Sequence, residues 1–127
     1  MSLINIINEF TVKDVEKAIN FYKNNFDFEV EETDGNPITW VKMKKDNVSI
    51  MLEAYKEVVK EIADFPLKTN TSNLIKFKYD DENEVTKIYR NFKDNNIEFF
   101  MEIKQTDYGT VEFGVFDLDK NMIIISN

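Results

Sequence analysis

The chain has 127 residues, a formal net charge of -8, and neither histidine nor cysteine. The missing imidazole and thiol groups exclude metal sites, proton relays and nucleophiles that depend on them. The acidic excess argues against nucleic-acid and anionic-membrane partners, whose phosphates are bound by cations.

The length suits a single domain over residues 1–127, because a chain of this size seldom splits into two cores. No run of about 18 apolar residues and no signal-peptide pattern is present, so we expect no membrane partner. The absence of cysteine agrees with a reducing compartment, and we expect a cytoplasmic protein.

The first half of the chain predicts a strand, a helix and three strands, which we call module 1 (residues 3–55). An apolar strand over residues 4–12 is followed by Asp14, a typical helix N-cap. The helix is expected to run to about Asn25, because apolar residues recur there at helical spacing. Three further strands are expected at residues 28–32, 39–44 and 48–53, separated by turn residues.

A connector and a second set of elements follow. Apolar residues at helical spacing over residues 57–65 predict a short amphipathic connector helix that Pro66 ends. Module 2 (residues 73–126) then repeats the order, with a strand over residues 74–79 and a helix that begins at Asp81 in a capping-box spacing. Its three remaining strands are expected at residues 97–103, 111–116 and 122–126.

Matched residues support a duplication. The positions of Asp14 and Asp81 differ by 67, and those of Trp40 and Phe113 differ by 73. Other matched pairs share these two offsets in the same order of elements. We therefore predict an α+β fold of two tandem βαβββ modules.

Three segments carry a resemblance to a known family: residues 12–22, 26–30 and 116–123, read as VKDVEKAINFY, FDFEV and FDLDKNMI. With this order of elements, the sequence resembles the vicinal oxygen chelate superfamily, which includes glyoxalase I, extradiol dioxygenases, fosfomycin-modifying enzymes and bleomycin-resistance proteins. The resemblance covers nearly the whole chain. It implies that the sheets of the two modules curve around a cleft, and that the protein is a homodimer.

The resemblance also implies where a metal site would lie, because the family's enzymes bind a divalent metal with one His, Glu or Gln from each of four strands. The matching positions in this chain are Ile7, Met51, Leu74 and Ile124. Alkyl and thioether groups do not bind the divalent cations that such chemistry uses. We therefore expect no metal and no other cofactor.

Errors of register in this assignment offer few alternatives. A shift of one residue would offer Asn8 or Asn73, but it turns the side chains to the other face of the strand. A shift of two keeps the face and would offer Glu9 and Glu53. It leaves unsuitable partners at the two remaining positions, Lys76 and Ser126.

Strand alternation predicts which other side chains face the cleft. Trp40 should share the face of Met51, and the repeat offset then adds Phe113. Phe99 and Phe100 are adjacent, so only one of them can face the cleft. The predicted ligand-binding residues are Ile7, Trp40, Met51, Glu53, Leu74, Lys76, Phe113 and Ile124. Simple core packing is the alternative for the aromatic and aliphatic members of this set.

Three functions remain open. The first is a metal-free homodimer of the bleomycin-resistance type that binds a small aromatic or cationic molecule, which the acidic charge would attract. The second is a lyase or isomerase, with Glu9 or Glu53 as the catalytic base or with a metal held by other ligands. The third is an interaction module whose cleft is closed.

Overall fold

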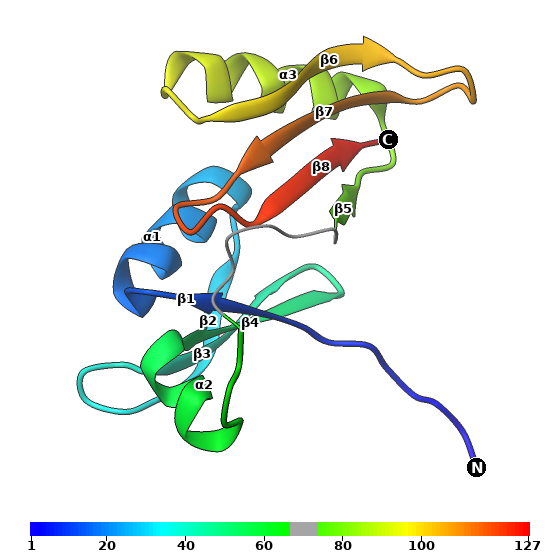
Figure 1. Ribbon diagram of the computed structural model, residues 1–127. Helices are drawn as coiled ribbons and strands as arrows, with labels where there is room; N and C mark the ends of the chain where they lie inside the picture. The colour runs from blue at the N-terminus through cyan, green and yellow to red at the C-terminus, as the bar shows by residue number, and fades with distance from the viewer. Residues whose placement is uncertain (67–73) are drawn as a thin grey trace. The chain divides into compact units, whose positions relative to one another are not determined.

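The chain is described here by a computed structural model that covers residues 1–66 and 74–127. Two compact units are present, Met1–Leu67 (unit 1) and Lys68–Asn127 (unit 2), and the division falls between the two predicted modules. Each unit contains one four-stranded mixed sheet, so the predicted α+β class is confirmed (Figure 1). Asn73, one of the alternatives considered above, lies outside the described residues. Within the described ranges, no helix has the length and apolar character needed to cross a membrane.

Unit 1 is built around helix α1 (Val15–Phe26). Its predicted N-cap is confirmed, since the Asp14 carboxylate accepts a hydrogen bond from the Lys17 backbone N–H at 3.1 Å. The helix ends at Asp27, which adopts a left-handed backbone conformation with φ of 59°. The remaining elements are β1 (Asn8–Val12), β2 (Glu29–Asp34), β3 (Trp40–Lys45), β4 (Val48–Ala54) and α2 (Tyr55–Glu61).

The sheet of unit 1 has the order β1-β4-β3-β2, in which β1 runs parallel to β4 and the other pairs are antiparallel. Helix α1 packs on one face of this sheet, where the ring of Phe10 stacks on that of Tyr22 at a centroid distance of 5.6 Å. Val41 and Leu52 are completely buried on the same face. The core of unit 1 therefore lies between α1 and the sheet.

Unit 2 repeats this arrangement around helix α3 (Glu82–Asp94). The predicted N-cap, Asp81, is confirmed, although its carboxylate accepts from the backbone N–H of Asn83 at 2.9 Å and not from that of Glu84. The strands are β5 (Ile75–Lys78), β6 (Phe99–Gln105), β7 (Val111–Phe116) and β8 (Met122–Ser126). Their order is β5-β8-β7-β6, which matches that of unit 1 strand for strand.

The strand registers confirm the predicted duplication. In unit 1 the parallel pair aligns Asn8 with Ile50, and in unit 2 it aligns Ile75 with Ile123. From unit 1 to unit 2, Asn8 corresponds to Ile75, 67 positions later, and Ile50 corresponds to Ile123, 73 positions later. These are the two offsets found in the sequence. The two units are therefore structural repeats of one βαβββ motif.

One predicted match between the repeats is wrong by one residue. Trp40 lies opposite Glu53 in unit 1, whereas the residue opposite Ser126 in unit 2 is Glu112 and not Phe113. Two residues separate the paired Lys45 and Val48, whereas three separate Asp117 and Asn121, which are hydrogen-bonded to each other, so the offset between β3 and β7 is 72. Phe113 consequently corresponds to Val41 and points to the helix-packed face.

Two predicted element boundaries also require correction. The first strand begins at Asn8 and not at residue 4; in its parallel register with β4, residues 4 and 5 would fall before Val48, where β4 begins. The connector helix α2 covers Tyr55–Glu61 and not residues 57–65. It ends at Ile62, whose backbone is extended, four residues before Pro66.

Candidate functional site

The face of the unit 1 sheet opposite α1, here called the Glu53 face, carries most of the predicted site residues of that unit. Trp40, Glu53 and Thr11 lie side by side across β3, β4 and β1. The next row along the strands is formed by Lys42, Met51 and Glu9. These alternate with the buried residues that pack against α1, as strand geometry requires.

Glu53 is the most unusual residue of this face. The residue is only 9% exposed, and within residues 1–66 and 74–127 its carboxylate has no hydrogen bond or ion pair. Burial raises the pKa of Glu53, and repulsion from Glu9, Glu61 and Glu57 raises it further. The structure therefore contains a desolvated carboxylate whose charged neighbours are themselves acidic.

The surroundings of Glu53 combine one aromatic ring with charged groups. Trp40 is half-buried and stands directly beside Glu53 in the sheet. Helix α2, which holds Glu57 and Glu61, packs against β1 and β4. The nearest lysine on β3, Lys42, is directed to Glu31 of β2 at 4.0 Å. The arrangement is suited to a ligand that brings its own positive charge and a flat ring.

The four positions of the family's metal ligands do not fit a metal. Ile7 lies just before β1 and is 42% exposed, and Met51 is half-buried on the Glu53 face. Leu74 lies just before β5 and is 53% exposed, whereas Ile124 of β8 is buried. None of these side chains offers a donor to a hard or borderline cation. Elsewhere in the described part of the chain, no group of three acidic side chains is arranged to hold a metal ion.

The alternative register positions are also clarified. Asn8 pairs with Ile50, which is buried against α1, so a shift of one residue would place the ligand in the core. Glu9 and Glu53 share the Glu53 face, as strand alternation predicts. Their counterparts in unit 2 are Lys76 and Ser126, which lie on the face opposite α3.

That face of unit 2, here called the Glu112 face, holds a buried charge cluster that the sequence did not predict. Glu112 is only 3% exposed, and its carboxylate accepts hydrogen bonds from Lys76 Nζ at 3.0 Å and Ser126 Oγ at 3.0 Å. The hydroxyls of Thr110 and Tyr108 donate to the same carboxylate, each at 3.2 Å. Lys76 Nζ also lies 5.9 Å from the centre of the Tyr108 ring.

The protonation state of Glu112 follows from this cluster. Burial alone would raise the pKa of Glu112, but hydrogen bonds from Lys76 and Ser126 outweigh it and hold the pKa below its usual range. The same hydrogen bond raises the pKa of Lys76. Glu112 was missed in the sequence because the repeat offset gave its place to Phe113. The length of the turn from Asp117 to Asn121 was the signal that would have identified it.

Phe113 is not part of either candidate face, so its predicted position toward the cleft is wrong. It is completely buried, and its ring lies 5.4 Å from Tyr89 and 5.9 Å from Phe92 of α3. Phe99 packs on the same side, at 5.6 Å from Phe113. Phe100 lies on the Glu112 face above Gly114, where a Cβ atom would come within 2.3 Å of its ring.

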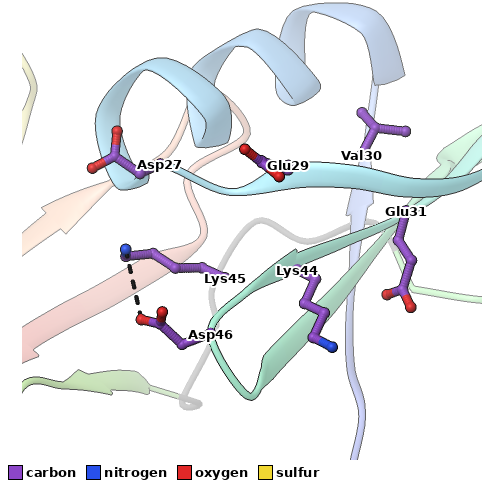
Figure 2. Close-up of a pocket in the computed structure, with 7 residues that line it drawn as sticks. All are labelled: Asp27, Glu29, Val30, Glu31, Lys44, Lys45 and Asp46. Atoms are coloured by element: carbon purple, nitrogen blue, oxygen red, sulfur yellow. Dashed lines mark ion pairs between the residues drawn. The ribbon is translucent and has the colours of Figure 1, made fainter.

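A hollow of about 550 Å³ lies beside β2 and the turn between β3 and β4 of unit 1, and neither Glu53 nor Trp40 lines it. Figure 2 shows its lining, which consists of four carboxylates, two lysines and one apolar residue: Asp27, Glu29, Glu31, Asp46, Lys44, Lys45 and Val30. Lys45 is paired with Asp46 at 3.6 Å. A largely charged, open hollow lacks the apolar walls that hold small ring-containing ligands.

Comparisons with known proteins agree with this fold. The family model described as Glyoxalase/Bleomycin resistance protein/Dioxygenase superfamily matches residues 4–125. A glyoxalase-related enzyme from Fulvimarina pelagi is similar in structure, with a TM-score of 0.83, 12% identity, and coverage of 98% of this chain and 88% of that one. A lactoylglutathione lyase from Agrobacterium tumefaciens has a TM-score of 0.78, 18% identity, and coverage of 97% and 92%.

A third solved structure, of a glyoxalase/bleomycin resistance protein/dioxygenase family enzyme from Burkholderia phytofirmans PsJN, has a TM-score of 0.81 and 18% identity, with coverage of 95% of each chain. Among proteins whose function has been curated, none matches the sequence. At these identities the structural likeness establishes the fold, and the chemistry must be argued from this chain's own residues.

Proposed function

Because the chain belongs to the Glyoxalase/Bleomycin resistance protein/Dioxygenase superfamily, we propose that it binds a cationic, ring-containing small molecule on the Glu53 face and does not use the metal chemistry of the family's enzymes. The observation that carries the proposal is Glu53, a residue only 9% exposed whose carboxylate still touches solvent and has no partner in the described residues. A buried charge without a partner is costly, and a ligand cation would compensate that cost.

Trp40 supplies the second half of the proposed site. It stands beside Glu53 in the sheet and is the only tryptophan of the chain. An indole ring attracts both flat apolar groups and cations placed over its face. The net charge of -8 would steer cationic ligands toward the protein from a distance.

Titration with a panel of cationic aromatic amines tests the proposal, with the fluorescence of Trp40 and calorimetry as independent readouts. We expect at least one compound to bind, and Glu53→Gln to weaken it by at least about tenfold, since truncating one partner of a desolvated charge pair costs 2 kcal/mol or more. Glu29→Gln is the matched control, because Glu29 is exposed on β2 of the same sheet. Absence of binding, or equal affinity in Glu53→Gln, would overturn the proposal.

One observation favours a second function, a lyase or isomerase in which Glu53 is the general base. Because the pKa of Glu53 is raised, it lies closer to neutral pH, as is favourable for a group that abstracts a proton. Glu9, the other predicted base, is exposed on the same face and fits this role less well. Turnover by the purified chain that disappears in Glu53→Gln and persists in chelator would support the enzyme. Metal analysis after reloading would reveal any ligand set at other positions.

The proposed assembly is a homodimer, in keeping with the resemblance. Apolar side chains at the start of the chain are exposed, with Leu3 at 88%, Ile4 at 93% and Ile6 at 84%. Exposed apolar groups in such a run are typical of surfaces that a partner covers. Light scattering on the eluted peak gives the mass directly, and a monomeric mass at all concentrations would refute the assembly.

A further inference from the structure

The Glu112 face of unit 2 contains its own ammonium group. Lys76 extends from β5 to Glu112 of β7, so that Nζ lies 3.0 Å from the carboxylate and 5.9 Å from the centre of the Tyr108 ring. The side chain of Glu112 is only 4% exposed, whereas the side chain of Lys76 is 44% exposed. Unit 2 thus combines a buried carboxylate, an ammonium and an aromatic ring.

The positions of unit 1 that match Lys76, Ser126 and Glu112 hold two carboxylates and an aromatic ring but no ammonium. The position of Lys76 is occupied by Glu9, since the residues differ by the repeat offset and each lies beside the matching residue of its neighbouring strand. The place of Ser126 is taken by Glu53, and that of Glu112 by Trp40. Repulsion from Glu9 contributes to the raised pKa of Glu53, so the two carboxylates are close enough to interact electrostatically.

We propose that the ligand of unit 1 carries a protonated primary or secondary amine attached to an aromatic ring, and that this ammonium supplies at Glu53 what Lys76 supplies at Glu112. The inference rests on the proposed function and specifies its ligand class. The expected pose directs an N–H of the amine to the Glu53 carboxylate and brings the ring to Trp40.

The need for an N–H follows from how Glu112 is stabilised. Its carboxylate receives four hydrogen bonds, from Lys76, Ser126, Thr110 and Tyr108. Glu53 receives none within residues 1–66 and 74–127. A quaternary ammonium carries the same charge but has no hydrogen to donate, so it would leave a desolvated carboxylate without a hydrogen bond.

Two matched probes test the ligand class, benzylamine and benzyltrimethylammonium. They carry the same ring and charge and differ in the N–H groups. We expect benzylamine to bind the wild-type chain at least about tenfold more tightly by Trp40 fluorescence and calorimetry. Equal or tighter binding of the quaternary compound would overturn the inference while the proposed function stands. If neither probe nor any amine of the panel binds, the inference and the proposed function both fail.

A substitution provides the second arm. Glu9→Lys places a lysine in unit 1 where unit 2 has Lys76, and its ammonium should form an ion pair with the Glu53 carboxylate. We expect the thermal midpoint to rise and benzylamine affinity to fall at least about tenfold. Glu29→Lys makes the same change of charge on β2 and should leave the affinity within about threefold. Unchanged affinity and midpoint in Glu9→Lys would overturn the inference, and the midpoint checks folding independently of the ligand.

Discussion

The two units place a buried carboxylate on the same face of the same motif, and they treat it in opposite ways. Glu112 of unit 2 is held ionised by Lys76 and by three hydroxyl groups, whereas Glu53 of unit 1 has no such partner in the described residues. Their pKa values shift in opposite directions. Burial raises the pKa of both groups, but hydrogen bonds outweigh burial at Glu112 and lower its pKa, whereas repulsion from acidic neighbours raises the pKa of Glu53 further. The fold is common to both units, so the difference lies in a few side chains.

This difference separates stability from binding. A carboxylate with internal donors contributes to the folded state and has little left to offer a ligand. A carboxylate without donors reduces stability, and proteins retain such groups mainly where function needs them. Under the proposed function, the Glu112 face of unit 2 resembles a filled version of the ligand site proposed on the Glu53 face of unit 1.

The largest effect is expected from Glu112→Gln. The amide keeps the shape but loses the charge that satisfies Lys76 and three hydroxyl groups, of which that of Ser126 belongs to a buried residue, so the free energy of unfolding at pH 7 should fall by about 2–4 kcal/mol. The pKa of Glu112 is lowered, so its stabilising effect is present above the pKa of the unfolded chain and is lost as pH falls through the folded value. Urea denaturation over a pH series should show the variant and wild type converging in acid.

Glu102→Gln is the control for that experiment. Glu102 is an exposed carboxylate of unit 2 that accepts hydrogen bonds from Lys93 and Tyr89. Solvent screens such pairs, so its removal should change stability far less than the removal of Glu112. Comparable losses in the two variants would show that the buried cluster has no special weight.

An intermediate effect is expected from Gly114→Ala. Gly114 lies opposite Ile124 in unit 2, the position that Lys42 takes opposite Met51 in unit 1. An added Cβ would meet the Phe100 ring at 2.3 Å, so the ring must move and the unfolding free energy should fall by about 1–3 kcal/mol. Gly114→Ala combined with Phe100→Ala should cost less than the sum of the two single changes, as measured by a double-mutant cycle. Simple additivity would contradict the packing seen here.

Most of the fold could be predicted because its signals are local. Asp14 and Asp81 cap helices whose apolar residues repeat at helical spacing, and such patterns need no knowledge of the rest of the chain. The repeat offsets of 67 and 73 agree with the registers of the parallel strand pairs in the two units. The start of the first strand was predicted too early because a strand also needs a neighbour, and β4 begins only at Val48.

The site was predicted less completely, because its residues depend on register. One additional residue in the turn after β7 moved Phe113 into the core and put Glu112 on the face beside Ser126. A slip of one residue exchanges the two faces of a strand, and composition alone does not reveal it. Trp40 and Glu53 were placed correctly on one face because the turn after β3 has two residues, as expected. That Glu53 lacks a partner depends on side-chain contacts that no sequence pattern encodes.

The smallest effect, and the one of opposite sign, is expected from Glu53→Gln in the absence of ligand. The pKa of Glu53 is raised, so its contribution to stability is most favourable below the pKa of the unfolded chain and is lost as pH rises through the folded value. Replacing it with an uncharged amide should therefore increase the unfolding free energy at pH 7, by about 1 kcal/mol. The gain should disappear in acid, where the wild-type carboxyl is itself protonated. Urea denaturation of both variants in one pH series gives the decisive comparison. If Glu53→Gln destabilises the chain at pH 7 as Glu112→Gln does, the two carboxylates are equivalent, and the Glu53 carboxylate is not left unpaired for a ligand.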